Sequence, residues 1–231
     1  MNLIWVMPAE GLVGIAIIIV TGASGPLPPV NEAGVHRFVI AADGGFNRAR
    51  AAELSVDLVV GDLDSVDLAD LAAAELLGTI VERHPTDKDA TDLELALDAA
   101  VRRDATSVTV LGGIGDRFDH LVGELGLLAS PRWNTIRVHA RYGPAAITVL
   151  HGPGSLTIDA QPGSLVSLVP THGTATGVTT NGLRYPLNHE TLPAGTTRGV
   201  SNVFTHSHAD VSVQSGCLLI VQPHRFEDFS S

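Results

Sequence analysis

The chain has 231 residues, of which 45% are hydrophobic and 17% are charged, a composition typical of a folded globular protein and not of a disordered or fibrous one. Its 25 acidic residues outnumber its 14 lysines and arginines and give a net charge of −11, so we expect neither nucleic acid nor a membrane surface as a partner. This length allows one large domain or two small ones.

Short apolar runs alternate with helical patterns through the first half of the chain. The first run, Ile15–Val20, is β-branched and ends in a glycine-rich loop, as a buried strand does. The apolar residues before it could be taken for a signal peptide, but they lack its basic segment and contain Glu10, so we expect them to be a variable extension. Buried strands that alternate with helices predict an α/β domain with a Rossmann-like parallel sheet. Further strands are expected at residues 37–42, 57–60, 79–82 and 107–111, and helices at 46–54, 67–77, 90–103 and 121–129.

From about residue 136 the pattern changes to short strand-like runs separated by glycine and proline turns. Such spacing is typical of an antiparallel sandwich. We therefore expect an α/β catalytic domain at residues 1–134 and an antiparallel β-sandwich domain at 135–231. The single cysteine, Cys217, is expected in a buried strand; it excludes an intrachain disulfide and indicates a cytoplasmic protein.

Aspartates follow the second and third predicted strands. Asp43 precedes two glycines, and Asp62 and Asp64 flank Leu63. Each could be an ordinary turn residue. However, ligands of open α/β sheets bind beyond the carboxyl ends of the strands, and alternate side chains of an extended loop point the same way. We therefore expect Asp62 and Asp64 to act as a pair.

Three more aspartates stand in the stretch Thr86–Leu97, ahead of a helical pattern. If the helix opens near Ala90, Asp89 and Asp92 lie about one turn apart and can point to the same place. Acidic residues also favour a helix start by themselves, and Thr91 fits a capping box, so helix capping explains part of this pattern.

Five carboxylates at one rim would repel one another unless a cation neutralised them. Carboxylate oxygens are the ligands that Mg²⁺ prefers, and Mg²⁺ is usually shared with phosphates. We expect Asp62, Asp64 and Asp92 to be the metal ligands. Lys88 is the single lysine among the 14 basic residues, and the other thirteen are arginines. A lone lysine between two aspartates indicates a need for a compact ammonium. We expect Lys88 or Arg117 to contact phosphate.

A glycine-rich loop leads into the helix expected at 121–129. Arg117, Asp119 and His120 stand at this helix entrance, where backbone N–H groups and a guanidinium could hold phosphate oxygens, although His120 could also be a capping or core histidine. The loop does not match the P-loop motif, which excludes that class. Later in the chain, His206 and His208 could present two imidazoles on one strand face, but no third metal ligand is indicated.

Taken together, these segments resemble the thiamine pyrophosphokinase family. Six motifs occur in the family's order, over about residues 15–222 of the chain. Two departures are visible: Asp116 stands where the family often has glycine, and the first fourteen residues precede the family's usual start. The matching segments are Ala42–Gly45, Gly61–Ser65, Lys88–Leu97, Arg117–His120, Thr180–Leu187 and Gly199–Asn202.

The resemblance implies transfer of a pyrophosphoryl group from ATP to thiamine, giving thiamine diphosphate and AMP, in a homodimer whose active sites lie between subunits. It implies that Asp43, Asp62, Asp64, Asp89 and Asp92 surround Mg²⁺ and the ATP phosphates, with Lys88 and Thr91 beside them. It also implies that Arg117, Asp119 and His120 complete the nucleotide side and that Leu183, Tyr185, Ser201 and Asn202 form the thiamine side.

Two other functions remain open from the sequence. A pyrophosphokinase that acts on a hydroxymethylpterin would need the same metal and ATP motifs, so only the second half of the chain favours thiamine. A non-catalytic sensor of nucleotide or thiamine diphosphate would have little use for so many acidic residues on one rim. The general base of the reaction is not indicated by any residue.

Overall fold

The computed structural model describes residues 15–22, 27, 37–114 and 117–226. The chain divides into two compact units, residues 1–116 and 117–231. This division lies earlier than the boundary expected after residue 134, so the helix and turn at 118–133 fall in the second of the two units. The expectations for residues 1–14 and for Asp116 lie outside the described residues.

The first unit contains a parallel sheet, as expected. Its strands lie in the order β4-β3-β2-β1-β5, and each neighbouring pair is parallel. The order reverses at β1, since the chain adds β2, β3 and β4 on one side of it and β5 on the other. Ligands of open α/β sheets bind at such a reversal, beyond the carboxyl ends of the strands. The strands are β1 (Ile15–Val20), β2 (Arg37–Ala42), β3 (Leu58–Gly61), β4 (Ile80–Arg83) and β5 (Ala105–Gly112).

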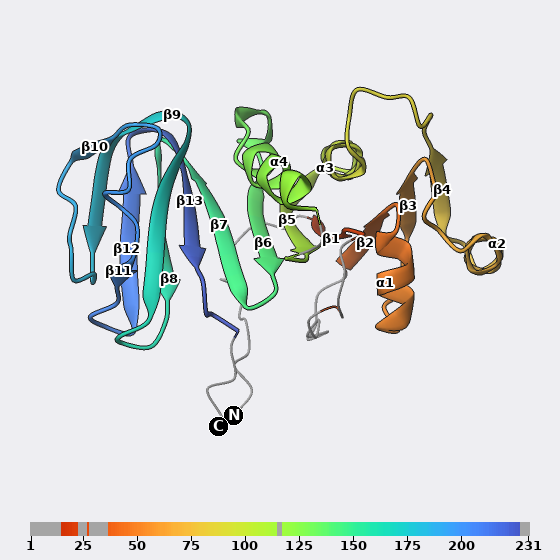
Figure 1. Ribbon diagram of the computed structural model, residues 1–231, viewed down its shortest axis with the longest axis horizontal. Coiled ribbons are helices and arrows are strands. Elements are labelled where there is room, and N and C mark those ends of the chain that lie inside the picture. The colour runs from red at the N-terminus through yellow and green to blue at the C-terminus, as the bar shows by residue number, and fades with distance from the viewer. Residues whose placement is uncertain (1–14, 23–26, 28–36, 115–116, 227–231) are drawn as a thin grey trace. The chain divides into compact units, whose positions relative to one another are not determined.

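Helices cover this sheet on both faces. Figure 1 shows α1 (Gly45–Ala51) and α3 (Asp92–Val101) on opposite sides of the strands. The chain moves outward from β1 through α1 and α2 and returns past the same strands through α3, which leads to β5. As the 3.6-residue pattern predicted, α3 turns Leu93, Ala96, Leu97 and Ala100 to the sheet.

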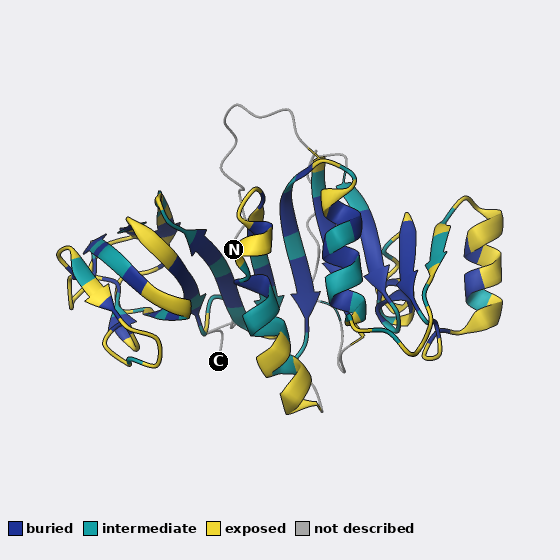
Figure 2. Ribbon diagram, turned by 90° about the horizontal axis from the view of Figure 1, so that it is seen from above, coloured by how far each residue is buried: buried dark blue, intermediate teal, exposed yellow. Residues whose placement is uncertain are grey.

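The outer edge of the first unit is more exposed. Helix α2 (Leu68–Leu76) buries Leu71 and Ala74 and turns its other side to solvent, as its yellow ribbon shows in Figure 2. By contrast, β3 is buried at every residue. The centre of the sheet therefore provides the rigid support for the loops at its carboxyl edge.

The second unit begins with α4 (Phe118–Leu128) and a short 3-10 helix at Pro131–Trp133, and continues with antiparallel strands. The indole of Trp133 is buried and donates to the Leu127 carbonyl at 2.8 Å, which closes the end of α4. The strands are β6 (Arg137–Tyr142), β7 (Ala145–His151), β8 (Gly154–Asp159), β9 (Leu165–Asn181), β10 (Glu190–Leu192), β11 (Asn202–Val203), β12 (His208–Val213) and β13 (Ser215–Gln222).

The 17-residue strand β9 connects the parts of this antiparallel fold. Its first part pairs with β13 and its last part pairs with β12. Apolar residues such as Leu168, Val178 and Leu218 fill the core between the strands. Cys217 lies buried in β13, as predicted. None of the described helices is long and apolar enough to cross a membrane.

Candidate active site

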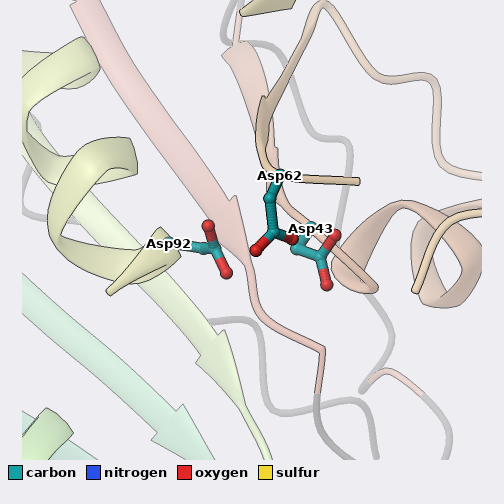
Figure 3. A group of neighbouring side chains, drawn as sticks. All are labelled: Asp43, Asp62 and Asp92. Atoms are coloured by element: carbon teal, nitrogen blue, oxygen red, sulfur yellow. The ribbon is translucent and has the colours of Figure 1, made fainter. Parts of the chain in front are cut away.

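Three aspartates from separate segments meet at the carboxyl edge of the parallel sheet. We call Asp43, Asp62 and Asp92 the aspartate triad: each offers one carboxylate oxygen, and these three oxygens lie within 4.8 Å of one another. Figure 3 shows Asp43 and Asp62 at the ends of neighbouring strands and Asp92 at the start of α3, with their carboxylates directed together. Among the described residues, no other group of three metal-ligating side chains meets this criterion, so His206 and His208 form no such site.

The backbone around Gly61 allows the triad to close. Gly61 has a φ of +151°, a conformation that residues with a Cβ rarely adopt. A Cβ at this position would lie 3.0 Å from the Cβ of Asp43 and 3.0 Å from Oδ1 of Asp92. The glycine before Asp62 therefore leaves the space in which two other triad members approach it.

Asp64 does not join the triad, contrary to the expected pairing with Asp62. Leu63 has a φ of +66° and packs in the apolar cluster that includes Phe46, so the loop is not extended and alternate side chains diverge. The carboxylate of Asp64 is exposed and accepts a hydrogen bond from Ser65 Oγ at 2.8 Å. Asp43, expected near Mg²⁺ and the ATP phosphates but not among the three metal ligands, lies beside Asp62 instead.

Asp89 also lies apart from the triad. Helix α3 begins at Asp92 and not near Ala90, because the Thr91 hydroxyl caps it by accepting the Glu94 N–H at 3.3 Å. Asp89 therefore stands before the helix, with its side chain exposed, and the expected one-turn spacing between Asp89 and Asp92 is not present. The contact that the structure gives the Thr91 side chain is this helix cap.

Lys88 joins two members of the triad. Its Nζ lies 3.2 Å from Oδ2 of Asp62 and 3.1 Å from Oδ1 of Asp92, and its side chain is only 14% exposed. Burial alone would lower the pKa of Lys88, but its contacts with the carboxylates of Asp92 and Asp62 outweigh burial and raise that pKa. The lysine is therefore an ammonium ion between two carboxylates.

Lys88 acts to lower the pKa of both aspartates, but the balance between this contact and burial differs between them. Burial acts to raise the pKa of Asp62, but the hydrogen bonds from Lys88 and from the Asp64 N–H outweigh it and hold that pKa below its usual value. Burial raises the pKa of Asp92, and the neighbouring charges of Asp43 and Asp62 add to the rise. Three carboxylates against one ammonium leave the site with an excess of negative charge.

The donor set fits a hard divalent cation. All three triad ligands are carboxylates, which suit Mg²⁺. Oδ1 of Asp43 is buried and has no hydrogen-bond partner among the described residues, and a buried acceptor without a partner is costly unless a cation or water satisfies it. The residues present therefore fit a divalent cation.

One residue at this edge was not anticipated from the sequence. Arg48, on α1, donates to the Thr21 carbonyl at 2.6 Å, the Leu111 carbonyl at 3.3 Å and the Gly112 carbonyl at 3.4 Å. These carbonyls stand at the carboxyl ends of β1 and β5, where the strand order reverses. Arg48 ties the two strands together at that point. In the sequence it is one of many arginines, and nothing local marks it.

The nucleotide-side residues expected after the glycine-rich loop lie at the start of α4. Arg117 donates twice to Asp119, at 3.0 and 2.7 Å, and this neighbouring guanidinium holds the pKa of Asp119 well below its usual range. Both side chains and that of His120 are exposed. The structure thus places the three on one exposed helix entrance of the second unit.

The four expected thiamine-side residues all lie in the second unit, but their side chains differ in burial and in hydrogen bonding. Asn202 is 3% exposed; its Oδ1 accepts the Tyr185 N–H at 3.0 Å and its Nδ2 donates to the Tyr185 carbonyl at 2.8 Å. The Leu183 side chain is buried in the core, whereas Tyr185 is 53% exposed. Ser201, with a φ of +58°, turns the chain just before Asn202. Asn202 therefore holds the Tyr185 segment in place.

Comparisons with known proteins agree with this arrangement. The family model for the thiamin pyrophosphokinase catalytic domain matches residues 32–140, and the model for the thiamin pyrophosphokinase vitamin B1 binding domain matches residues 155–218. A thiamine pyrophosphokinase of Bacillus subtilis is 28% identical over 162 residues, which cover 70% of this chain and 76% of the relative.

Solved structures show the same likeness across both units. The crystal structure of a Bacillus subtilis thiamine pyrophosphokinase has a TM-score of 0.78 and 27% identity, covering 90% of this chain and 98% of that one. The thiamin pyrophosphokinase of Geobacillus thermodenitrificans has a TM-score of 0.77 and 27% identity, covering 94% and 99%.

Proposed function

Since the chain belongs to the thiamin pyrophosphokinase family, we propose that its aspartate triad holds the Mg²⁺ that accompanies ATP in the family's reaction. The family transfers the pyrophosphoryl group of ATP to thiamine, and thiamine diphosphate and AMP are the products. The observation that carries the proposal is the meeting of Asp43, Asp62 and Asp92 at one edge of the sheet, with a buried Asp43 oxygen left without a partner among the described residues.

The reaction determines what the site has to do. The hydroxyl oxygen of thiamine attacks the β-phosphorus, the bond between that phosphorus and the bridging oxygen to the α-phosphorus breaks, and AMP leaves with the electron pair. The hydroxyl proton is released. Such a transfer requires in-line positioning and neutralisation of charge on the phosphates. When bound, Mg²⁺ supplies part of that neutralisation.

The chain's own residues supply the remainder. The triad holds its carboxylates at fixed positions on two strand ends and a helix start, so little rearrangement is needed when ligands arrive. We assign Lys88 a contact with a phosphate oxygen, because it is a compact ammonium beside the triad. The negative charge of the site also suits the thiazolium cation of thiamine.

The remaining expected residues take secondary roles in this proposal. Asp64, in the loop after β3, and Asp89, in the loop after β4, are exposed and are not among the three proposed ligands. Thr91 sets the start of α3. Arg117, Asp119 and His120 stay assigned to the nucleotide. Tyr185 and Ser201 stay assigned to thiamine, with Leu183 and Asn202 anchoring their segment through the core packing and the hydrogen bonds described above.

We also propose that the enzyme is a homodimer with active sites between subunits and that it acts in the cytoplasm, where a free buried thiol such as Cys217 persists. Sedimentation would measure the mass in solution. Asp62→Asn and Tyr185→Ala should each be much less active than the wild type, and mixing the two should restore activity if one site draws on two subunits. A monomer, or a mixture without activity, would contradict this part.

Incubation with ATP, Mg²⁺ and one acceptor, followed by detection of AMP, tests the function. We expect AMP with thiamine and none with a hydroxymethylpterin. The vitamin B1 binding match at residues 155–218 favours thiamine. AMP formed only with the pterin would contradict the acceptor, and tight nucleotide binding without turnover would indicate a sensor.

A further inference from the structure

The ammonium of Lys88 lies where it competes with a metal ion. It contacts Asp62 and Asp92 at 3.2 and 3.1 Å, and these are two of the three proposed ligands of Mg²⁺. The side chains of Lys88, Asp62 and Asp92 are 14%, 11% and 29% exposed, so water screens their interaction only in part. A cation that binds here therefore interacts strongly with the charges of these three side chains.

A divalent cation bound to the same carboxylates would lie close to this ammonium. Ligand oxygens stand about 2.1 Å from Mg²⁺, so a metal held by Asp62 and Asp92 would be only a few ångströms from Nζ. The two positive charges would repel each other, and the lysine would also lose its hydrogen bonds if it moved to solvent. Metal binding by the triad alone is therefore opposed by Lys88.

A triphosphate removes this opposition. Its oxygens offer the ammonium new acceptors, and the flexible four-carbon stem of lysine allows Nζ to turn from the carboxylates to a phosphate. The metal can then occupy the triad while the lysine neutralises the phosphates. By thermodynamic linkage, a nucleotide that frees the carboxylates tightens the metal, and the metal tightens the nucleotide by the same factor.

We infer that Lys88 weakens metal binding to the empty site and couples metal binding to the arrival of ATP. Lys88 is the counter-ion of the triad before substrate binds and a phosphate contact afterwards. The site thus takes up metal together with nucleotide and does not hold a resident ion. This inference rests on the proposed triad as the metal site.

Mn²⁺ titration followed by electron paramagnetic resonance, which counts free Mn²⁺, tests this inference without catalysis. The titration is made with and without α,β-methylene-ATP, in which the bond that breaks in the reaction is replaced, and the Mn²⁺ that the analogue binds without protein is measured separately and subtracted. For the wild type, we expect the analogue to tighten Mn²⁺ binding at least tenfold. For Lys88→Met without nucleotide, we expect Mn²⁺ to bind roughly tenfold or more tightly than to the wild type, because the competing charge is gone.

Two matched variants separate position from net charge. Arg83→Met removes one positive charge from an exposed ion pair with Glu75 and should leave Mn²⁺ affinity nearly unchanged. Lys88→Gln removes the charge but keeps a hydrogen-bond donor, so it should also bind Mn²⁺ more tightly than the wild type, and it serves as the test if the methionine variant is poorly folded. Circular dichroism verifies folding of each variant.

Equal or weaker Mn²⁺ binding by both folded Lys88 variants, without nucleotide, would overturn the inference. Equal tightening of Mn²⁺ by the analogue in the wild type and in Lys88→Met would overturn it as well. Failure of the proposed metal site gives a different result, because Asp62→Asn would then bind Mn²⁺ as the wild type does. An intact triad site with unchanged affinity in the Lys88 variants therefore rejects only the role of Lys88.

Discussion

Asp62 and Asp64 are two residues apart in the chain, but only Asp62 directs its carboxylate to Asp43 and Asp92. The residue between them, Leu63, adopts a φ of +66° and buries its side chain in the apolar cluster beneath the loop. One backbone conformation thus assigns two chemically identical side chains to different surroundings.

This difference predicts unequal effects of the same substitution. Asp62→Asn should reduce turnover by about 10²-fold or more, because it removes one carboxylate of the proposed metal site, and the metal neutralises charge on the transferred phosphates. Asp64→Asn makes the same chemical change on an exposed residue and should reduce turnover much less. Steady-state AMP release measures both, with thermal unfolding as the control for folding. Equal losses in the two variants would place Asp64 among the ligands.

Removal of Arg48 should weaken the first unit at the point where its strand order reverses. Arg48→Leu leaves three strand-end carbonyls without this donor, and we expect a loss of about 1–3 kcal/mol in the free energy of unfolding. Arg50→Leu is the matched control, since Arg50 forms an ion pair with Asp70 in which both side chains are nearly half exposed. Such pairs contribute little. Urea unfolding compares the two, and similar losses would contradict the assigned role.

Asn202 should matter for the position of the Tyr185 segment. Asn202→Ala removes both hydrogen bonds to the Tyr185 backbone and leaves that backbone unpaired, at a cost of about 1–3 kcal/mol in unfolding free energy. The KM for thiamine should rise more than the KM for ATP. Asn188→Ala, on an exposed loop position, serves as the control. An unchanged KM for thiamine in Asn202→Ala would separate this segment from acceptor binding.

Stability should fall in mild acid because of His139. Burial lowers the pKa of His139 to about 4, whereas an unfolded chain titrates it near its ordinary value of about 6.5. Between these two values the unfolded chain binds the proton and the folded protein does not, so unfolding becomes easier as the pH falls from about 6.5 to 4. The contribution of this one group is roughly 3 kcal/mol.

Urea unfolding at several pH values measures this dependence. His139→Gln should flatten the fall in unfolding free energy over that interval, because glutamine takes up no proton. Comparing slopes and not absolute stabilities separates the proton effect from any change in packing. Parallel curves for the wild type and the variant would show that His139 does not contribute.

Local pattern determined most of the fold. β-Branched runs such as Ile15–Val20, which is buried from its third residue on, are typical of a covered parallel sheet, and the apolar spacing from Leu93 to Ala100 favours a helix with one face packed on that sheet. The turn-rich second half predicted antiparallel strands for a similar reason. These features depend on neighbouring residues, and neighbouring residues are what a sequence displays.

The membership of the site was decided by the tertiary structure. Asp43 lies beside Asp62 because β2 and β3 pair, and Arg48 reaches β5 only because α1 packs near the ends of two strands that are far apart in the sequence. The exclusion of Asp64 and Asp89 came from a left-handed Leu63 and a helix cap at Thr91. Residue type and spacing bring carboxylates to one edge, but the direction of each depends on packing and backbone conformation.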